Sequence, residues 1–104
     1  MKSKVYALSE IKDKIAETVK KQPVYCVVLF GSYAKGTADS LSDIDLMVDS
    51  KGELKGFDFY ALLEDLSQIF DKKVDLISKD QVVASSKIDE IIKQEGIVVY
   101  ERED

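Results

Sequence analysis

The sequence contains no histidine, a single cysteine, a single proline and no long apolar run. Without histidine, the chain lacks the commonest general base and the commonest zinc ligand, so any chemistry must use carboxylates, hydroxyls and lysines. A bound metal would therefore be a hard cation held by oxygen, such as Mg²⁺. Cys26 cannot form an internal disulfide, and its place in an apolar run predicts a buried, unreactive thiol.

The sequence also lacks a membrane segment and an excess of positive charge. No apolar stretch approaches the roughly 20 residues that a membrane span needs, and no secretory signal pattern is present, so we expect a cytoplasmic protein. The net charge is −5, whereas proteins that bind long nucleic acids usually have basic surfaces. We therefore expect a small charged substrate or a basic protein partner, with no direct binding of nucleic acid or membrane.

The apolar patterning predicts an α/β (α+β) fold in one domain, residues 1–104, with helices packed against a small mixed sheet. Apolar runs or alternation predict strands at residues 24–30, 42–49, 73–77 and 97–101. Helical periodicity predicts helices at residues 9–21, 57–72 and 86–96, with a short helix after Ser32. The predicted order of elements is αβαβαβαβ.

Capping residues and apolar stripes give these elements more detail. Ser9 is the predicted N-cap of the first helix, and Ser86 with Asp89 forms a predicted capping box that opens the last one. The segment 24–30 is apolar throughout, which predicts a strand buried on both faces. A helical stripe in 57–72 is assigned to the core, and its members are Phe59, Leu62, Leu63, Leu66, Ile69 and Phe70. Phe57 and Tyr60 fit the core or an interface equally well.

Three aspartates lie inside otherwise aliphatic strands. Alternate residues of a strand share a face, so Asp43 and Asp45 lie together, and Asp75 joins them if its strand pairs alongside. Two carboxylates ~4 Å apart repel by roughly 1 kcal/mol in water and roughly 4 kcal/mol near a protein surface. Three would consume an appreciable part of a net stability of only ~5–15 kcal/mol. A bound divalent cation removes this repulsion, so the trio is a predicted metal site.

A calcium loop is the alternative explanation for the alternating acids. An EF-hand loop requires glycine at its sixth position and polar spacers, but this segment has Val48 there and aliphatic spacers. The calcium loop is therefore disfavoured. Asp39 and Asp49, which lie near strand ends, are interpreted as turn formers or solvated charges.

Gly31 and Ser32 directly follow the buried strand 24–30. Backbone amides at a helix start, a glycine that permits close approach and a serine hydroxyl together form a site for a phosphate group. A Gly-Ser pair alone is usually only a turn. Its combination with a strand that carries two aspartates and a strand that carries a third makes phosphate binding the better prediction.

Gly31-Ser32, ten intervening residues and Asp43-x-Asp45 resemble the signature of the DNA polymerase β nucleotidyltransferase superfamily. Within it, the segments GSYAKG…SDIDLMVD, KKVDLIS and EGIVVYE resemble those of minimal nucleotidyltransferase (MNT) proteins. Such proteins are commonly encoded beside a small helical HEPN protein as toxin–antitoxin pairs. The resemblance extends over nearly the whole chain, from the first helix to the last strand.

The resemblance implies a role for each of these residues. Gly31 and Ser32 would hold the phosphates of ATP, and Asp43 and Asp45 would bind two Mg²⁺ ions. Asp75 would complete the metal site and help to deprotonate the attacking hydroxyl. The reaction would be an in-line attack on the α-phosphorus with pyrophosphate leaving, a mechanism that requires no histidine.

Three functions are compatible with this resemblance. The first is transfer of AMP from ATP to a hydroxyl of a partner HEPN toxin, with tyrosine as the expected acceptor. The second is modification of a small molecule such as an aminoglycoside, which the lack of an acceptor domain disfavours. The third is a non-catalytic antitoxin that neutralises its partner by complex formation, and the acidic balance suits docking of either antitoxin on a basic partner.

Lys35 departs from the family pattern, because many members have arginine at this position. Lysine keeps the charge but loses the bidentate fork that binds phosphate. A contact with phosphate, a pair with the protein's own acids and a solvated helix residue are all compatible with the sequence, and the last is slightly favoured.

Overall fold

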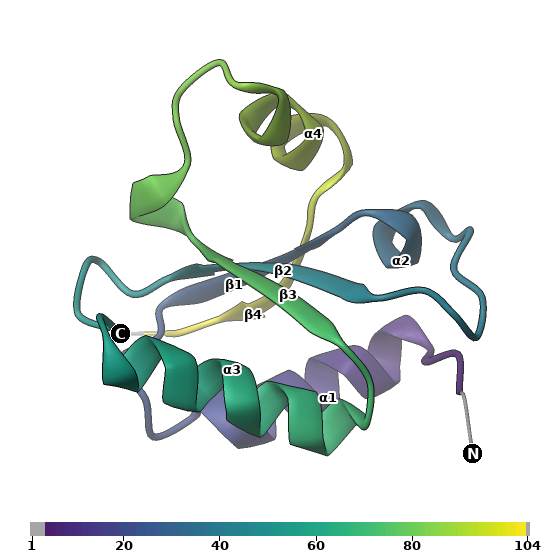
Figure 1. The fold of residues 1–104 in the computed structure, drawn as a ribbon, viewed down its shortest axis with the longest axis horizontal. Coiled ribbons are helices and arrows are strands. Elements are labelled where there is room, and N and C mark those ends of the chain that lie inside the picture. The colour runs from purple at the N-terminus through teal and green to yellow at the C-terminus, as the bar shows by residue number, and fades with distance from the viewer. Residues whose placement is uncertain (1–3, 104) are drawn as a thin grey trace.

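A computed structural model describes residues 4–103 as a four-stranded sheet with helices on both faces (Figure 1). The strands are β1 (Cys26–Phe30), β2 (Ile44–Asp49), β3 (Val74–Ser78) and β4 (Ile97–Glu101). The helices are α1 (Leu8–Val19), α2 (Ser32–Lys35), α3 (Phe57–Phe70) and α4 (Lys87–Glu95), and the 3-10 turn η1 (Lys79–Gln81) follows β3. The predicted fold class and order of elements are confirmed.

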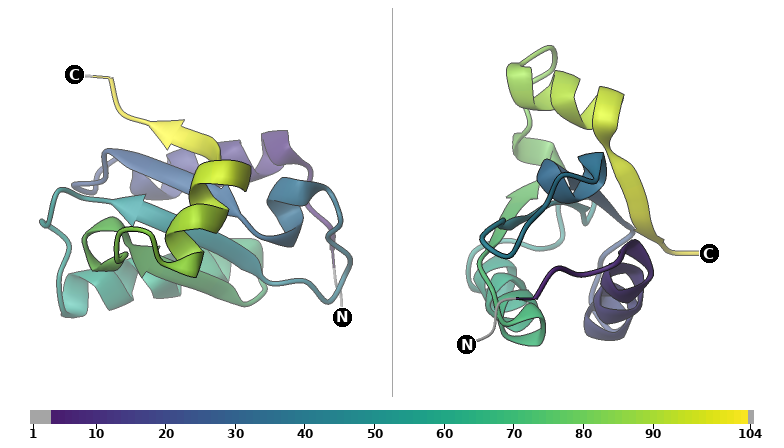
Figure 2. Two further views of the ribbon diagram at one scale, coloured as in Figure 1. Left: turned by 90° about the horizontal axis from the view of Figure 1, so that it is seen from above. Right: turned by 90° about the vertical axis from the view of Figure 1, so that its right-hand side faces the viewer.

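The sheet is mixed, as predicted, with the strand order β3-β2-β1-β4. The central strand β1 is antiparallel to both β2 and β4, whereas β2 and β3 are parallel. Figure 2 shows α1 and α3 side by side on one face of the sheet, with α4 on the other. This arrangement leaves the end of β1 and the starts of β2 and β3 at one edge of the sheet.

The central strand β1 is buried on both faces, as its apolar run predicts. Val27 and Leu29 belong to the main core under α1 and α3, whereas Val28 and Phe30 join Met47 in a second, smaller cluster next to α4. The alternation predicted for β2 is also confirmed, since its residues on the main-core side are Ile44, Leu46 and Val48.

Helix α3 packs its predicted stripe against the sheet. Leu62, Leu66 and Phe70 are fully buried, and the partly buried members that pack against the core are Phe59, Leu63 and Ile69. Phe57 and Tyr60 are 93% and 66% exposed. Neither of these two aromatic residues therefore belongs to the core.

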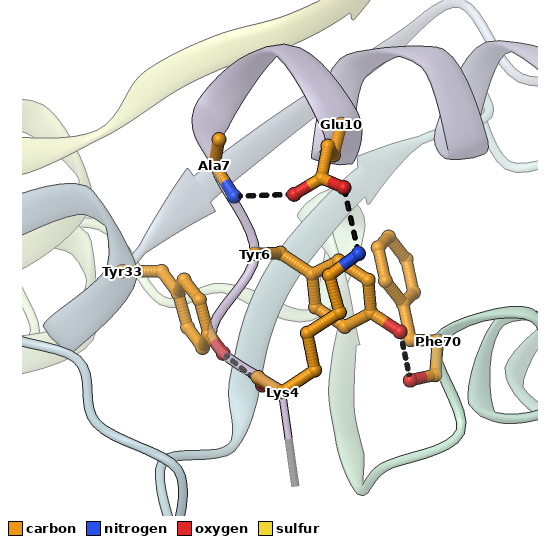
Figure 3. A network of polar contacts seen from close by, with 6 residues as sticks. All are labelled: Lys4, Tyr6, Ala7, Glu10, Tyr33 and Phe70. Atoms are coloured by element: carbon orange, nitrogen blue, oxygen red, sulfur yellow. Dashed lines mark hydrogen bonds and ion pairs between the residues drawn. The ribbon is translucent and has the colours of Figure 1, made fainter. Parts of the chain in front are cut away.

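The predicted N-cap of α1 at Ser9 is wrong, because the helix already begins at Leu8 with Ala7 as its cap. The backbone N–H of Ala7 donates to the Glu10 carboxylate at 2.9 Å, and the other oxygen of Glu10 accepts from Lys4 Nζ at 2.7 Å (Figure 3). A carboxylate inside the first turn therefore satisfies the helix start. No serine hydroxyl is needed there.

The predicted start and end of α4 are confirmed with one difference. The Ser86 side chain caps the helix by accepting from the backbone N–H of Asp89 at 3.2 Å, and Gly96 ends it. The Asp89 carboxylate, however, accepts from the backbone N–H of Ser85 at 2.8 Å. The reciprocal half of the capping box has therefore moved one residue toward the N-terminus.

Three further predictions concern the single cysteine, membrane-spanning helices and the number of domains. Cys26 is half-buried beside the smaller cluster, and burial raises the pKa of its thiol, which disfavours the reactive thiolate. Within residues 4–103, no helix is both long and apolar enough to cross a membrane. The assignment of residues 1–104 to a single domain stays a prediction.

Candidate active site

The strand register brings two of the three predicted acids side by side. In the parallel pairing of β2 with β3, Asp45 lies directly opposite Asp75. In the antiparallel pairing of β1 with β2, Asp45 lies opposite Phe30, the last residue before the Gly-Ser turn. Asp43 immediately precedes β2. The three acids and the turn therefore gather at one edge of the sheet.

Gly31 is the residue at which the turn lies against Asp45. Its φ of 77° lies in the left-handed region, and its carbonyl accepts from the backbone N–H of Ala34 and of Lys35 in the single turn of α2. A Cβ on Gly31 would collide with Oδ2 of Asp45. Both the backbone conformation and the neighbouring carboxylate therefore require glycine here.

The pKa of Asp45 is raised by the surroundings of its carboxyl group. Burial, followed by a hydrogen bond and the charge of Asp75 and by the charge of Asp43, raises the pKa of Asp45 to about 6. The nearby charge of Lys73 opposes this shift. Burial is thus the first cause of the raised pKa, and two acidic neighbours add to it while a single lysine opposes it.

Lys73 is the residue of this site that sequence reasoning missed. Its Nζ lies 3.8 Å from Oδ2 of Asp43 and 3.8 Å from Oδ1 of Asp75. One signal could have found it, because Lys73 precedes Asp75 by two residues and so shares its face of the strand. The lysine links Asp43 to Asp75.

The three carboxylates fit a hard divalent cation by their chemistry. Oxygen ligands and negative charge are what Mg²⁺ prefers in proteins, and after burial the neighbouring carboxylates of Asp75 and Asp43 are the causes that raise the pKa of Asp45. Within residues 4–103, no three acidic, histidine or cysteine side chains enclose a single point at metal-binding distance. Asp43 and Asp75 instead flank the ammonium group of Lys73.

Tyr33 braces the Gly-Ser turn against the strand that carries Asp75. Its hydroxyl accepts from Lys72 Nζ at 3.0 Å, just before β3, and donates to the backbone carbonyl of Lys4 at 3.5 Å (Figure 3). Tyr6, two residues further on, donates to the carbonyl of Phe70 at 2.6 Å. The N-terminal segment thus ties α2 to the connection between α3 and β3.

Asp39 and Asp49 have the structural roles that were predicted. The Asp39 carboxylate accepts from the backbone N–H of Leu41 at 2.9 Å, which is a local turn. Asp49 accepts from the backbone N–H of Lys51 at 3.0 Å and lies 3.7 Å from Lys79 Nζ. Each of these two acids therefore has its own donors.

Lys35, the residue that departs from the family pattern, lies in an ion pair. Its Nζ is 3.9 Å from Oε2 of Glu95 on α4, and 52% of its side chain is exposed. The structure has both a long pair with one of the protein's own acids and the exposure expected of a solvated helix residue, and a contact with phosphate stays a prediction.

A family model described as "Polymerase beta, Nucleotidyltransferase" matches residues 13–104. The chain belongs to this nucleotidyltransferase family. The match includes the Gly-Ser turn and all three acids, and the prediction that the chain is a nucleotidyltransferase is confirmed.

Two similar proteins come from Methanocaldococcus jannaschii. "Putative protein adenylyltransferase MJ1215" is 35% identical over 86 residues, which cover 79% of this chain and 100% of that protein. "Putative protein adenylyltransferase MJ1379" is 41% identical over 81 residues, which cover 72% of this chain and 81% of that protein. The chain thus corresponds to most or all of each relative.

Solved structures share the fold. A chain of a structure described as a toxin-antitoxin with AMP-PNP has a TM-score of 0.75 and 24% identity, over 88% of this chain and 73% of that chain. A chain of the tri-AMPylated Shewanella oneidensis HEPN toxin in complex with MNT antitoxin has a TM-score of 0.70 and 20% identity, over 91% and 73%. These likenesses establish the nucleotidyltransferase fold of the chain.

Proposed function

We propose that this nucleotidyltransferase moves AMP from ATP to a hydroxyl group of a partner protein. The observation that carries the proposal is the pairing of Asp45 with Asp75 directly beside Gly31. The names of the M. jannaschii relatives, which describe protein adenylyltransferases, support a protein as the acceptor.

In this proposal, the Gly-Ser turn holds the triphosphate. The backbone amides of Ser32 and Tyr33 and the hydroxyl of Ser32 would donate to phosphate oxygens. Because Gly31 has no Cβ, the Asp45 carboxylate can lie directly against the backbone of this turn. The acids then lie next to the bound phosphates, where the reaction takes place.

Asp75 receives the proton of the acceptor hydroxyl in the transfer step. The acceptor oxygen forms a bond to the α-phosphorus, the bond from that phosphorus to the bridging oxygen of the β-phosphate breaks, and pyrophosphate leaves. Asp43, Asp45 and Asp75 are the residues that would hold Mg²⁺. When bound, the metal would supply positive charge that stabilises the entering and leaving oxygens.

The proposed partner is a HEPN toxin, with a tyrosine hydroxyl as the acceptor. The solved neighbours include a HEPN toxin in complex with an MNT antitoxin. The net charge of −5 favours a partner with a basic surface. Adenylylation of such a toxin would make this chain its antitoxin.

A second candidate function is neutralisation of the same partner by complex formation alone. Phe57 and Tyr60 on α3 are 93% and 66% exposed and offer an aromatic contact surface. Exposed aromatic residues are common anchors in protein interfaces. This function would not depend on the three acids.

The two functions are separated by following the label of α-³²P ATP. The protein is mixed with labelled ATP, Mg²⁺ and the HEPN-type product of a neighbouring gene, and label is sought on that partner. We expect labelled tyrosine with the unmodified protein and at least about a hundredfold less with Asp45→Asn, since even partners that only support a metal ligand contribute 10- to 100-fold.

The matched control is Asp39→Asn, because Asp39 is a nearby loop aspartate whose role in its turn an asparagine can take over. This variant should label the partner as well as the unmodified protein does. The catalytic proposal would be overturned if the unmodified protein and Asp45→Asn both bind the partner and neither transfers label to it. That result would support neutralisation by binding.

A further inference from the structure

Lys73 holds a fixed place between the acids. It directly precedes β3. Its backbone carbonyl accepts a hydrogen bond at 3.1 Å from the N–H of Ile44, which is the residue between Asp43 and Asp45. This bond sets the start of β3 against the start of β2. The lysine side chain therefore leaves the backbone beside the acids, on the same side of the strand as Asp75.

The ammonium group of Lys73 lies close to two acidic side chains at once. Among the ion pairs of residues 4–103, it alone lies within 4.0 Å of two different acidic residues, at 3.8 Å from each. Lys79, by comparison, lies 3.7 Å from Asp49 alone. A positive charge thus lies between two of the side chains proposed to hold Mg²⁺.

The contacts of Lys73 are of a kind that a metal ion can displace. Both distances exceed hydrogen-bond length, so the attraction is between charges only. The Lys73 side chain is 70% exposed, and its flexible four-carbon stem allows the ammonium group to move into solvent. Exposed ion pairs of this kind are weak.

We propose that Lys73 is the resident counter-cation of the gap between Asp43 and Asp75, and that it must move out before a divalent cation can bind there. This inference rests on the proposed function, because it concerns how the same site is regulated. Lys73 stabilises the metal-free protein by reducing the repulsion among the acids. It also lowers the affinity of the site for a metal ion, because the two cations compete for the same oxygens.

The experiment measures Mn²⁺ affinity by electron paramagnetic resonance, without nucleotide or partner. Lys73→Met removes the charge and keeps the apolar stem, and Lys73→Arg keeps the charge. The matched control is Lys79→Met, which removes a lysine of similar exposure from the single pair with Asp49. We expect Lys73→Met to bind Mn²⁺ about threefold to tenfold more tightly than the unmodified protein. Lys73→Arg and Lys79→Met should stay within about twofold of it.

Melting temperatures in EDTA provide the second readout. Lys73→Met should melt below both the unmodified protein and Lys73→Arg, because the acids lose their counter-charge. An Mn²⁺ affinity of Lys73→Met equal to or below that of the unmodified protein would overturn the inference and leave the proposed function intact. An absence of Mn²⁺ binding in every variant would overturn both.

Discussion

The two ends of β2 carry aspartates in opposite situations. At the C-terminal end, Asp49 accepts from the backbone N–H of Lys51 and lies 3.7 Å from Lys79 Nζ. Near the N-terminal end, Asp45 lies opposite Asp75, and its pKa is raised to about 6, by burial first and by its acidic neighbours second. Asp49 therefore has a hydrogen-bond donor and a lysine of its own, whereas Asp45, on the same face of the same strand, lies among other acids.

This difference separates a structural acid from a candidate functional one. An acid with its own donors contributes to the fold and requires no ligand. Crowded acids cost folding free energy, and proteins keep such strain mainly at sites where a ligand relieves it. The start of β2 is therefore the place where we expect a bound cation to change the stability of the protein most.

The largest expected effect comes from adding a methyl group beside Asp45. Gly31 and Gly36 have φ values of 77° and 79°, but only at Gly31 would a Cβ meet the Asp45 carboxylate. Gly36→Ala should cost about 1–2 kcal/mol through the left-handed backbone alone. Gly31→Ala should cost about 2–4 kcal/mol, because its backbone (φ 77°, ψ −154°) lies in a region that essentially only glycine adopts, and the collision adds to that strain.

Urea unfolding of the two glycine variants measures this difference. Gly31 (φ 77°, ψ −154°) and Gly36 (φ 79°, ψ 17°) differ in backbone conformation, so the excess loss in Gly31→Ala combines greater backbone strain with the contact to Asp45. The contact is isolated by repeating Gly31→Ala in an Asp45→Ala background, where it should cost less because the obstructing carboxylate is gone. An equal cost of Gly31→Ala in both backgrounds would mean that the turn does not lie against Asp45.

The second effect concerns pH, with Asp45→Asn as the variant. The pKa of Asp45 rises from an ordinary 3.8 to about 6 on folding, so its ionised form destabilises the folded state. Below pH 3.8 the group is protonated in both states and this cost is absent. The cost develops as the pH rises from 3.8 to about 6 and is complete above that.

Asparagine carries no charge at any of these pH values, so the variant escapes the cost. In EDTA at pH 7.5 (about one and a half units above the raised pKa), Asp45→Asn should be more stable than the unmodified protein by about 1–2 kcal/mol, after allowance for partial exposure. That is a melting temperature higher by about 4–8 °C for each kcal/mol. The gain should disappear near pH 4, and a gain independent of pH would contradict the assignment.

The smallest expected effect is that of Tyr33→Phe, which removes the hydroxyl that joins Lys72 to the carbonyl of Lys4. We expect a loss of about 0.5–1.5 kcal/mol, the usual contribution of such hydrogen bonds. Tyr60→Phe is the control on an exposed ring and should change stability by less than about 0.5 kcal/mol. Equal small changes would show that the brace of the turn contributes nothing.

Patterns that depend on neighbours in the chain could be read from the sequence. The apolar stripe of α3 and the alternation of β2 follow from periods of 3.6 and 2, and both are confirmed. The start of α1 was mispredicted for a local reason, because Glu10 caps a helix that Ser9 was expected to cap. Here two capping groups competed, and propensity alone could not rank them.

Features that depend on strand register could be predicted only on the condition that particular strands pair with one another. The sequence treats Asp43 and Asp45 alike, whereas the pairing of the strands places Asp45 against Gly31 and opposite Asp75. The place of Lys73 between two acids depends on the same register and on its side-chain conformation. No pattern along one segment contains that information.

The central claim is that the acids at the start of β2 form a cation-dependent seat for a triphosphate beside Gly31. Its most direct test is the melting temperature of the unmodified protein and Asp45→Asn, each in EDTA and with Mg²⁺ plus a non-hydrolysable ATP analogue. We predict that Asp45→Asn melts higher in EDTA and that the unmodified protein gains far more from Mg²⁺ and nucleotide, because only its site binds them fully. Equal melting of both proteins under both conditions would contradict the account.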